Sequence, residues 1–361
     1  MPNQKASIAP TQPENTLSAK TGHNDPPPPQ PSSNMSSSEL DFRYRCGCVS
    51  KTSFALKTDH DSARIKQSSD FALGLHHLSI EELLCLQLSG YSSRQIITAS
   101  LEEAEHWKDL AAKASAARDK AKRILDKQAQ TGVTTIPYYS TDYPCPFYNL
   151  RNEAPPLIHV SGNKELLHRE DCVAIIGARA ADTQGQDTAY HFARQIGEQN
   201  HIVISGLALG CDTVAHRGCL DAGGPTLAIV ASGLDITHPK ANKSLQDEIV
   251  EKGGAILSEH PFGMKANPTR LVARCRMQVA LPRSVIVAQC SILSGTMHAV
   301  RFAQQYANNT RRQLYAVQYN HWNELNSGNK FLLEQGIAHP IRPEEKISLN
   351  EHKLLECKKN I

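Results

Sequence analysis

The chain has 361 residues, of which 21% are charged and 40% are apolar, and its formal net charge is +3 at pH 7. These values are typical of a globular protein with two or three domains, and they permit a nucleic-acid partner without requiring one. No apolar run approaches the ~18 residues of a membrane-spanning helix, and the N-terminus lacks a secretory signal pattern, so we expect a cytoplasmic protein with no membrane partner.

The ten cysteines are scattered along the chain without a Cys-x-x-Cys pair. Several lie inside apolar strand or helix patterns, which is typical of buried, reduced thiols. The only close pair, Cys46 and Cys48, has no further ligands at the spacing of a zinc site. The sequence therefore predicts no metal centre and no cofactor.

The chain begins with a polar region. Residues 1–65 are rich in Pro, Ser, Asn and Gln, a composition that cannot bury enough apolar area to offset the entropy of ordering, so we expect a disordered tail there. Leucine and isoleucine patterns predict a small helical domain at 70–135. A connector rich in proline and aromatic residues then leads into a short strand at 157–162, which we expect at the edge of a sheet. A Rossmann-like domain, including this connector, is expected over 136–343, and a polar tail over 344–361.

Strands alternate with helical segments from residue 172 onward. Strands that are apolar almost throughout are typical of a parallel sheet covered by helices on both faces, and right-handed crossovers then give a doubly wound arrangement. The expected fold class is α/β, an extended Rossmann-like doubly wound parallel sheet preceded by a small helical domain and a disordered N-terminal tail. The strands are expected at 172–177, 201–205, 226–231, 255–258, 284–289 and 313–317.

Two strand–turn–helix units in this region share one pattern. One strand ends in Gly177-Ala178-Arg179, and the other ends in Ser205-Gly206, with Gly210 just before the next helix. A helix N-terminus that a ligand can approach closely through glycine is a ready anion site. Both turns are expected at the carboxyl edge of the sheet, where ligands of open α/β folds bind.

Several catalytic signatures are absent from the sequence. It contains no dinucleotide fingerprint Gly-x-Gly-x-x-Gly, no Walker phosphate loop, no His-Glu-x-x-His and no Gly-x-Ser-x-Gly. NAD binding and ATP hydrolysis through a phosphate loop are therefore disfavoured, and no catalytic residue is assigned. Asp212 and His216 stand one helical turn apart and could form a dyad. The favoured reading is that Asp212 caps or lines the helix start and that His216 packs and hydrogen-bonds beside the sheet.

Basic residues follow or precede several of the predicted strands. Arg179 lies at the carboxyl end of a strand, Lys240 and Lys243 lie in a loop at the same edge, and Arg274 and Arg276 lie just before the fifth strand. One explanation is a solvated basic face, and the other is a rim that follows a phosphate backbone. Few aromatic residues nearby could stack on bases: the candidates are Tyr190, His238 and Phe262.

Short motifs occur in a characteristic order. They are Ile175-Ile176-Gly177-Ala178-Arg179, the block Ser-Gly-x-Ala-x-Gly-x-Asp-x-x-Ala-His from Ser205 to His216, Gly233-Leu234-Asp235, His238-Pro239-Lys240-Ala241-Asn242-Lys243 and Leu257-Ser258-Glu259. Together they resemble the DprA/Smf family of DNA-processing protein A over roughly residues 75–340. The resemblance implies a Rossmann fold that binds single-stranded DNA, dimerises and helps load the RecA recombinase on incoming DNA in natural transformation. It also implies that the protein is not an enzyme.

The sequence departs from the family pattern at several positions of the expected site, including Val279-Ala280 in place of a small Ala-Gly pair. Ala178 replaces a serine in the first turn, Cys275 replaces an asparagine between Arg274 and Arg276, and Gln289 replaces a glutamate after the fifth strand. The resemblance implies DNA contacts for the arginine of the first turn and for the lysine of the Pro-Lys-Ala-Asn element.

The main hypothesis is a recombination mediator with single-stranded DNA, the RecA recombinase and a second copy of the chain as partners. DNA contacts are expected from Arg179, Lys240, Lys243, Arg274, Arg276, Gly177, Ser205, Gly206 and Gly210. The resemblance places a self-contact near the C-terminal end of the Rossmann-like domain, and the candidates are Met297, Val300, Leu314, Phe331 and Leu332.

The alternative is a nucleotide-binding or nucleotide-hydrolysing protein similar to phosphoribohydrolases. Such an enzyme needs a carboxylate near the ribose, for which Asp212 and Glu259 are the candidates. It also needs a phosphate loop with consecutive glycines, and the absence of a Gly-Gly-Gly loop tells against it.

Overall fold

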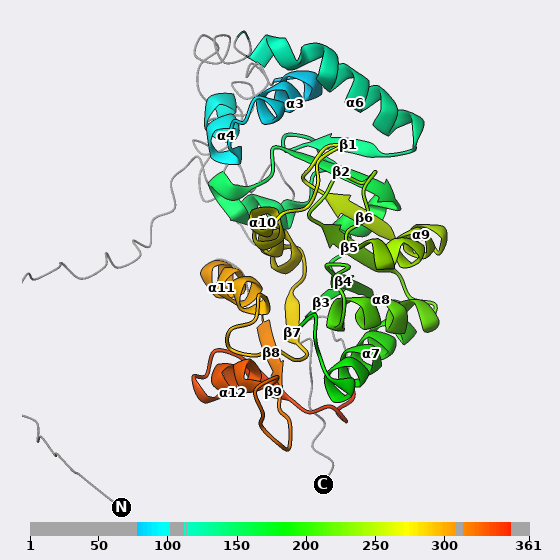
Figure 1. Cartoon of the computed structure of the whole chain (residues 1–361), viewed down its shortest axis with the longest axis vertical. Helices are drawn as coiled ribbons and strands as arrows, with labels where there is room; N and C mark the ends of the chain where they lie inside the picture. The colour runs from blue at the N-terminus through cyan, green and yellow to red at the C-terminus, as the bar shows by residue number, and fades with distance from the viewer. Residues whose placement is uncertain (1–77, 102–111, 113, 308–312, 348–361) are drawn as a thin grey trace, which may run out of the picture.

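The computed structural model describes residues 78–101, 112, 114–307 and 313–347 (Figure 1). The tail expected at 1–65 lies outside these residues, and so does the expected C-terminal tail from residue 348 onward. None of the helices in the described part of the chain is long and apolar enough to cross a membrane.

Helices precede the sheet, as the sequence predicts. They include α3 (Ile80–Leu88), α4 (Ser93–Leu101) and α6 (Arg118–Gln130). Helix α3 begins at a capping box: the Ser79 hydroxyl accepts from the Glu82 N–H at 3.2 Å, and the Glu82 carboxylate accepts from the Ser79 N–H at 2.8 Å. The buried leucines of α3 pack with α6 and with Leu157 of the sheet. The boundaries of a separate helical domain stay a prediction.

The described residues form one sheet in the order β1-β2-β6-β5-β4-β3-β7-β8-β9. Strands β3 to β9 are mutually parallel, whereas β2 pairs antiparallel with β6 and with β1. The mostly parallel α/β sheet confirms the predicted fold class. The strands are β1 (Thr134–Pro137), β2 (Leu157–Gly162), β3 (Cys172–Ile176), β4 (Ile202–Ser205), β5 (Thr226–Val230), β6 (Ala255–Ser258), β7 (Ser284–Val287), β8 (Gln313–Val317) and β9 (His339–Ile341).

The expectation that 157–162 forms an edge strand is wrong. Strand β1 pairs outside β2, with Thr134 opposite Val160 and Pro137 opposite Leu157, and takes the edge itself. Proline has no N–H to donate, so it suits an outermost strand that ends in a turn. The sequence signal for β1 was weak because this strand has only four residues.

Helices cover both faces of the sheet, and Figure 1 shows α7, α8 and α9 on one side and α10 and α11 on the other. Their bounds are α7 (Thr183–Glu198), α8 (Cys211–Asp221), α9 (Lys243–Glu251), α10 (Pro268–Ala280), α11 (Thr296–Ala307) and α12 (Ser327–Glu334). Short 3-10 helices lie at η1 (Ser115–Ala117), η2 (Cys145–Glu153), η3 (Lys164–His168) and η4 (Lys240–Asn242).

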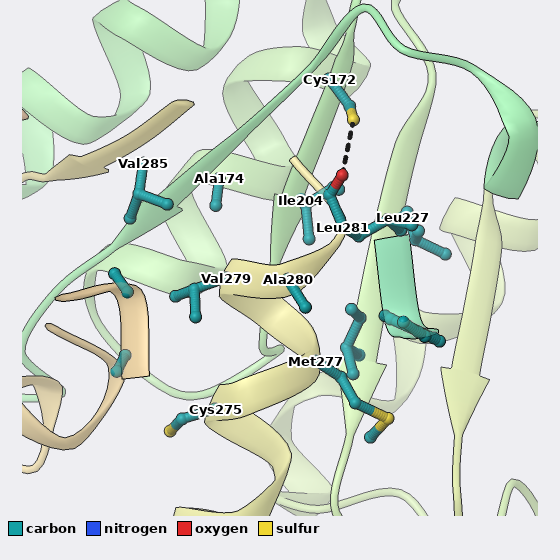
Figure 2. Close-up of a cluster of buried hydrophobic side chains, with 14 of the residues drawn as sticks. Cys172, Ala174, Ile204, Leu227, Cys275, Met277, Val279, Ala280, Leu281 and Val285 are labelled. Atoms are coloured by element: carbon teal, nitrogen blue, oxygen red, sulfur yellow. Dashed lines mark hydrogen bonds between the residues drawn. The ribbon is translucent and has the colours of Figure 1, made fainter. Parts of the chain in front are cut away.

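Alternate residues of each central strand face opposite layers of the core. Ala174 and Ile204 belong to the cluster formed with α10, whereas Val173 and Val203 belong to the cluster formed with α7 and α8. Figure 2 shows Met277, Val279 and Ala280 of α10 beside the first of these faces. Where α10 ends, the Cys172 thiol donates to the Leu281 carbonyl at 3.8 Å.

The strand order reverses at β3. The chain runs from β3 through β4 and β5 to β6 on one side and then crosses to β7 on the other side of β3. In open α/β sheets such a switch point leaves a crevice at the carboxyl ends of the two strands, because their connections leave in opposite directions. A ligand-binding site is therefore expected at the turns after β3 and β7.

Candidate nucleic-acid interface

The turns after β3 and β4 lie against each other at this edge. The Cys211 N–H donates to the Ala178 carbonyl at 3.2 Å, and the Ala178 N–H donates to the Gln289 carbonyl at 2.7 Å. A Cβ at Gly177 would overlap the Cys211 side chain, and a Cβ at Gly210 would overlap the carbonyls of Ala178 and Arg179. Both glycines are thus required for the turns to pack on each other. The sequence predicted another role for them, in which the absence of a side chain lets a phosphate approach the backbone.

Helix α7 begins at the same place. The Asp182 carboxylate accepts from the Gly185 N–H at 2.8 Å and caps the helix. The Gln289 side chain holds this cap from the β7 turn: its Oε1 accepts from the Asp182 N–H at 3.0 Å, and its Nε2 donates to the Asp182 carboxylate at 2.8 Å. Between β3 and this cap, Arg179 is exposed, and no hydrogen-bond or ion-pair partner for it occurs among the described residues.

Buried side chains form hydrogen bonds that fix the turn after β4. The Ser205 hydroxyl donates to the Ile175 carbonyl at 2.7 Å and is fully buried, so it serves the sheet. Asp212 accepts from the N–H groups of Gly206 and Ala208 at 3.2 and 3.4 Å. Burial raises the pKa of Asp212, and nearby Arg274 opposes that rise. Asp212 thus organises the turn and lines the start of α8, as expected, but it does not cap that helix, which has no side-chain cap hydrogen bond.

His216 lies on the next turn of α8 and is buried. The Thr226 hydroxyl donates to the Val203 carbonyl at 2.8 Å, so it accepts from His216 Nδ1 at 2.7 Å. The imidazole is therefore the Nδ1–H tautomer, and its buried Nε2 has no hydrogen-bond partner among the residues that the structure describes. Burial lowers the pKa of His216 to about 3, and the positive charge of Arg274 contributes. His216 and Asp212 bond to different partners and form no dyad.

The loop after β5 adds the lysines of the site. Lys240 and Lys243 are both exposed. Lys243 forms an ion pair with Asp247 on the next turn of α9. Between them, Asn242 is buried and donates from Nδ2 to the Leu207 carbonyl and the Thr213 hydroxyl, both at 2.9 Å. Asn242 thereby fixes the lysine loop to the β4 turn, where Leu207 has a φ of +59°.

Arg274 and Arg276 lie inside the protein, each 6% exposed. Arg274 Nη1 donates to the carbonyls of Gly206 and Ile229. Arg276 forms a bidentate pair with Glu259 at 2.7 and 2.5 Å and also donates from Nε to the Glu153 carbonyl at 2.8 Å. This burial argues against the expectation that the two guanidinium groups contact phosphates, because protein acceptors occupy them.

The two carboxylates of the alternative hypothesis are also occupied. Glu259 is buried against Arg276, and Asp212 accepts from the backbone of the β4 turn. Burial alone would raise the pKa of Glu259, but the charge and hydrogen bonds of Arg276 offset it and lower that pKa below its usual range. Neither carboxylate faces an open ribose site in this conformation.

The aromatic candidates are only partly available. Phe262 is 8% exposed and lies under Lys127, whose Nζ is 5.9 Å from the ring centroid. Tyr190 donates from its hydroxyl to Asp221 at 2.9 Å on the α7–α8 side. His238 is exposed in the lysine loop. Trp322, which no sequence motif indicated, is 37% exposed at the same edge, and the polar residues on both sides of it are a usable signal of exposure.

Known proteins share sequence with the region that carries these turns and loops. Residues 134–351 match the family model described as DNA recombination-mediator protein A. The chain is 34% identical to the DNA processing protein DprA of Streptococcus pneumoniae over 51% of its own length and 63% of that protein. It is 29% identical to protein Smf of Escherichia coli over 58% of its own length and 54% of that protein. The chain therefore spans somewhat more than half the length of these curated relatives.

Solved structures agree as well. DNA processing protein A from Streptococcus pneumoniae superposes with a TM-score of 0.60 at 28% identity, over 73% of this chain and 95% of the other. The Helicobacter pylori protein, described for its single-stranded DNA binding mode, superposes with a TM-score of 0.52 at 29% identity, over 58% of this chain and 90% of the other.

The fold and the matched region together define a Rossmann-like protein of the DNA-processing class. The chain belongs to the DNA recombination-mediator protein A family, since the family model covers more than half of its residues. This confirms the resemblance seen in the sequence.

Proposed function

We propose that the protein binds single-stranded DNA at the carboxyl edge of the sheet and acts as a recombination mediator. The observation that carries the proposal is the exposed Arg179 at the switch point, which has no partner within the described part of the chain and lies beside the N-terminus of α8, a helix without a side-chain cap. A free guanidinium next to a helix N-terminus favours an anionic ligand. Family membership and the Helicobacter pylori relative favour a nucleic-acid backbone as that ligand.

Lys240 extends the cationic surface along the edge. Its loop is fastened to the β4 turn through Asn242, so buried hydrogen bonds fix the backbone that carries Lys240 relative to that turn. Gly206, Gly210 and Gly177 shape the turns that carry this surface. Lys243 contributes less in this proposal because Asp247 already neutralises it.

The proposed mechanism is binding without bond breaking. The strand would be held by its phosphates and passed to a RecA-type recombinase, with a second copy of the chain supplying a second site. Two linked sites bind a flexible strand more tightly than one, because the second contact is intramolecular. The buried and paired state of Asp212 and Glu259 supports a role without catalysis.

A titration with matched single-stranded and duplex oligomers over a range of salt tests this proposal. Single strands should bind more tightly, with about 0.7 added to the magnitude of the log–log salt slope for each phosphate neutralised. Equal or tighter binding to duplex would contradict the proposal. Incubation with nucleoside monophosphates tests the alternative, for which the expected signal is a released base.

A further inference from the structure

The large apolar side chains that are most exposed in the described part of the chain all lie at the carboxyl edge. They are Leu209, Ile292, Leu293, Trp322 and Leu325. Leu209 follows β4, the next two follow β7, and the last two follow β8. Single exposed apolar residues are ordinary, but their gathering on three loops at one edge marks an interaction surface.

The loop that carries Trp322 is fixed in place. The buried Asn326 accepts from the Asn323 N–H at 2.8 Å and donates from Nδ2 to the His321 carbonyl at 3.0 Å, so one side chain holds the backbone on both sides of Trp322. The neighbouring loop is tied to it, because the Ile292 N–H donates to the Ser327 hydroxyl at 3.1 Å. A loop whose backbone is already fixed loses little entropy when a ligand binds to it.

Strand order aligns this surface with the cations. Along the edge, the strands run β5, β4, β3, β7, β8, so Lys240 and Arg179 come first and Trp322 comes last. Neighbouring strands lie about 4.8 Å apart, which brings the β3 and β8 loops within reach of one extended ligand. The edge therefore carries its cations after β5 and β3, with Leu209 between them, and apolar side chains with an aromatic ring after β7 and β8.

A single strand of nucleic acid combines both kinds of group, since its phosphates are anionic and each base has a π-face. Glu324 is exposed in the Trp322 loop and would repel a phosphate there, which favours a base at this position. We propose that Trp322 stacks on a base of the strand whose phosphates lie at Arg179 and Lys240, with Ile292 and Leu293 beside that base. This inference rests on the proposed function and adds a base-contacting residue to it.

The test uses the emission of Trp322 itself. The chain has two tryptophans, and Trp107→Phe leaves Trp322 as the only one. This variant is titrated with an oligo-dT and with an abasic oligomer of the same length, which has the phosphates but no bases. The oligo-dT should quench Trp322, and the abasic oligomer should bind without quenching.

Affinity measurements on further variants complete the test. Trp322→Ala should weaken oligo-dT binding by about 5- to 150-fold, the loss expected for one base–aromatic stack, and leave abasic binding unchanged. Trp322→Phe should retain most of the affinity. Tyr190→Ala is the matched control, because it removes a partly exposed aromatic ring away from this edge and should change neither affinity.

The outcomes separate the inference from the function on which it rests. If neither oligomer binds the unaltered protein, the proposed function itself fails. If both bind with equal affinity and without quenching, or if Trp322→Ala weakens both equally, base stacking at Trp322 is overturned while DNA binding stands. A Trp322→Ala variant that keeps oligo-dT affinity but loses self-association would assign the surface to a second copy of the chain instead.

Discussion

The Arg274 guanidinium packs directly against Gly206. Its Nη1 donates to the Gly206 carbonyl, and a Cβ at Gly206 would overlap the same guanidinium group. The arginine is buried, its Nε has no hydrogen-bond partner in the described ranges, and it lies close enough to Asp212 to oppose the rise of that carboxyl's pKa. It therefore acts as a support beneath the β4 turn.

Gly206→Ala should displace the Arg274 side chain and weaken its hydrogen bonds. Hydrogen bonds to a charged group are worth about 1.5–3 kcal/mol each, so the free energy of unfolding should fall by an amount of this order. Urea unfolding measures the change. Gly295→Ala is the control, since a Cβ there meets open space and should leave stability nearly unchanged. Equal stability of the two variants would show that Arg274 can move without loss.

Gly210→Ala should destabilise the protein more than Gly223→Ala. Both glycines have a positive φ, +73° and +75°, but a Cβ at Gly210 would meet two backbone carbonyls, whereas Gly223 faces open space. A positive φ costs about 1–2 kcal/mol for a residue that carries a Cβ. Gly210 combines it with a ψ of −129°, outside the left-handed helical region, so the excess loss at Gly210 reports this backbone conformation together with the close approach of the two turns. Denaturation midpoints measure the two losses of stability. Equal losses in Gly210→Ala and Gly223→Ala would contradict this packing.

Acid should weaken the fold in part through His216. Its pKa is about 3 in the folded protein, against an ordinary value near 6.5, so only the unfolded chain gains a proton as the pH falls from about 6.5. Stability from this residue is present above that pH and declines by about 2 kcal/mol on reaching pH 5. His216→Asn should flatten the dependence of unfolding free energy on pH in this range. An unchanged slope would show that the imidazole is not buried and neutral.

The ion pair of Glu259 and Arg276 should contribute most to the free energy of unfolding near neutral pH. Glu259→Gln leaves a buried guanidinium without its counter-charge and should lower stability by about 3–5 kcal/mol. The folded-state pKa of Glu259 is lowered, so its contribution is present above the ordinary glutamate pKa and is lost as the pH falls below it. The difference between wild type and variant should therefore shrink in acid. A difference that is constant with pH would rule out an ionised pair.

The dimer prediction can be tested on two neighbouring residues of α12. Leu332 is fully buried, as Val300 nearly is, while Phe331 is half-buried at the rim of the same cluster. Phe331→Glu should give a folded monomer if this face is the self-contact, whereas Leu332→Glu should unfold the domain because it places a charge in the core. Light scattering and circular dichroism separate these results. A wild-type mass of one chain at micromolar concentration would contradict the dimer.

Strands with nearly continuous apolar sequence were predictable, and β3 to β8 lie within a few residues of their expected positions. Their burial on both faces leaves a pattern that a sequence shows directly. The short outer strands β1 and β9 were not found, because four and three residues carry too little periodicity.

Site residues were harder to predict because residue type does not report exposure. Arg179 and Arg274 look alike in the sequence, yet one is exposed and the other is buried against Gly206. The difference depends on which turns the sheet order brings together, and that is a long-range property. Trp322 was missed for the same reason: its loop reaches the site only because β8 lies beside β7.

The most direct test of DNA binding at this edge is a paired measurement on Arg179→Ala and Arg283→Ala. Both remove one exposed arginine, but Arg283 precedes β7 at the opposite edge of the sheet, where it pairs with Glu170. Arg179→Ala should weaken single-stranded DNA binding and reduce the magnitude of the salt slope by about 0.7, with a stability change of only ~0.5 kcal/mol. Arg283→Ala should bind as wild type does. Unchanged affinity in Arg179→Ala, or equal losses in both variants, would contradict a DNA site at the carboxyl edge.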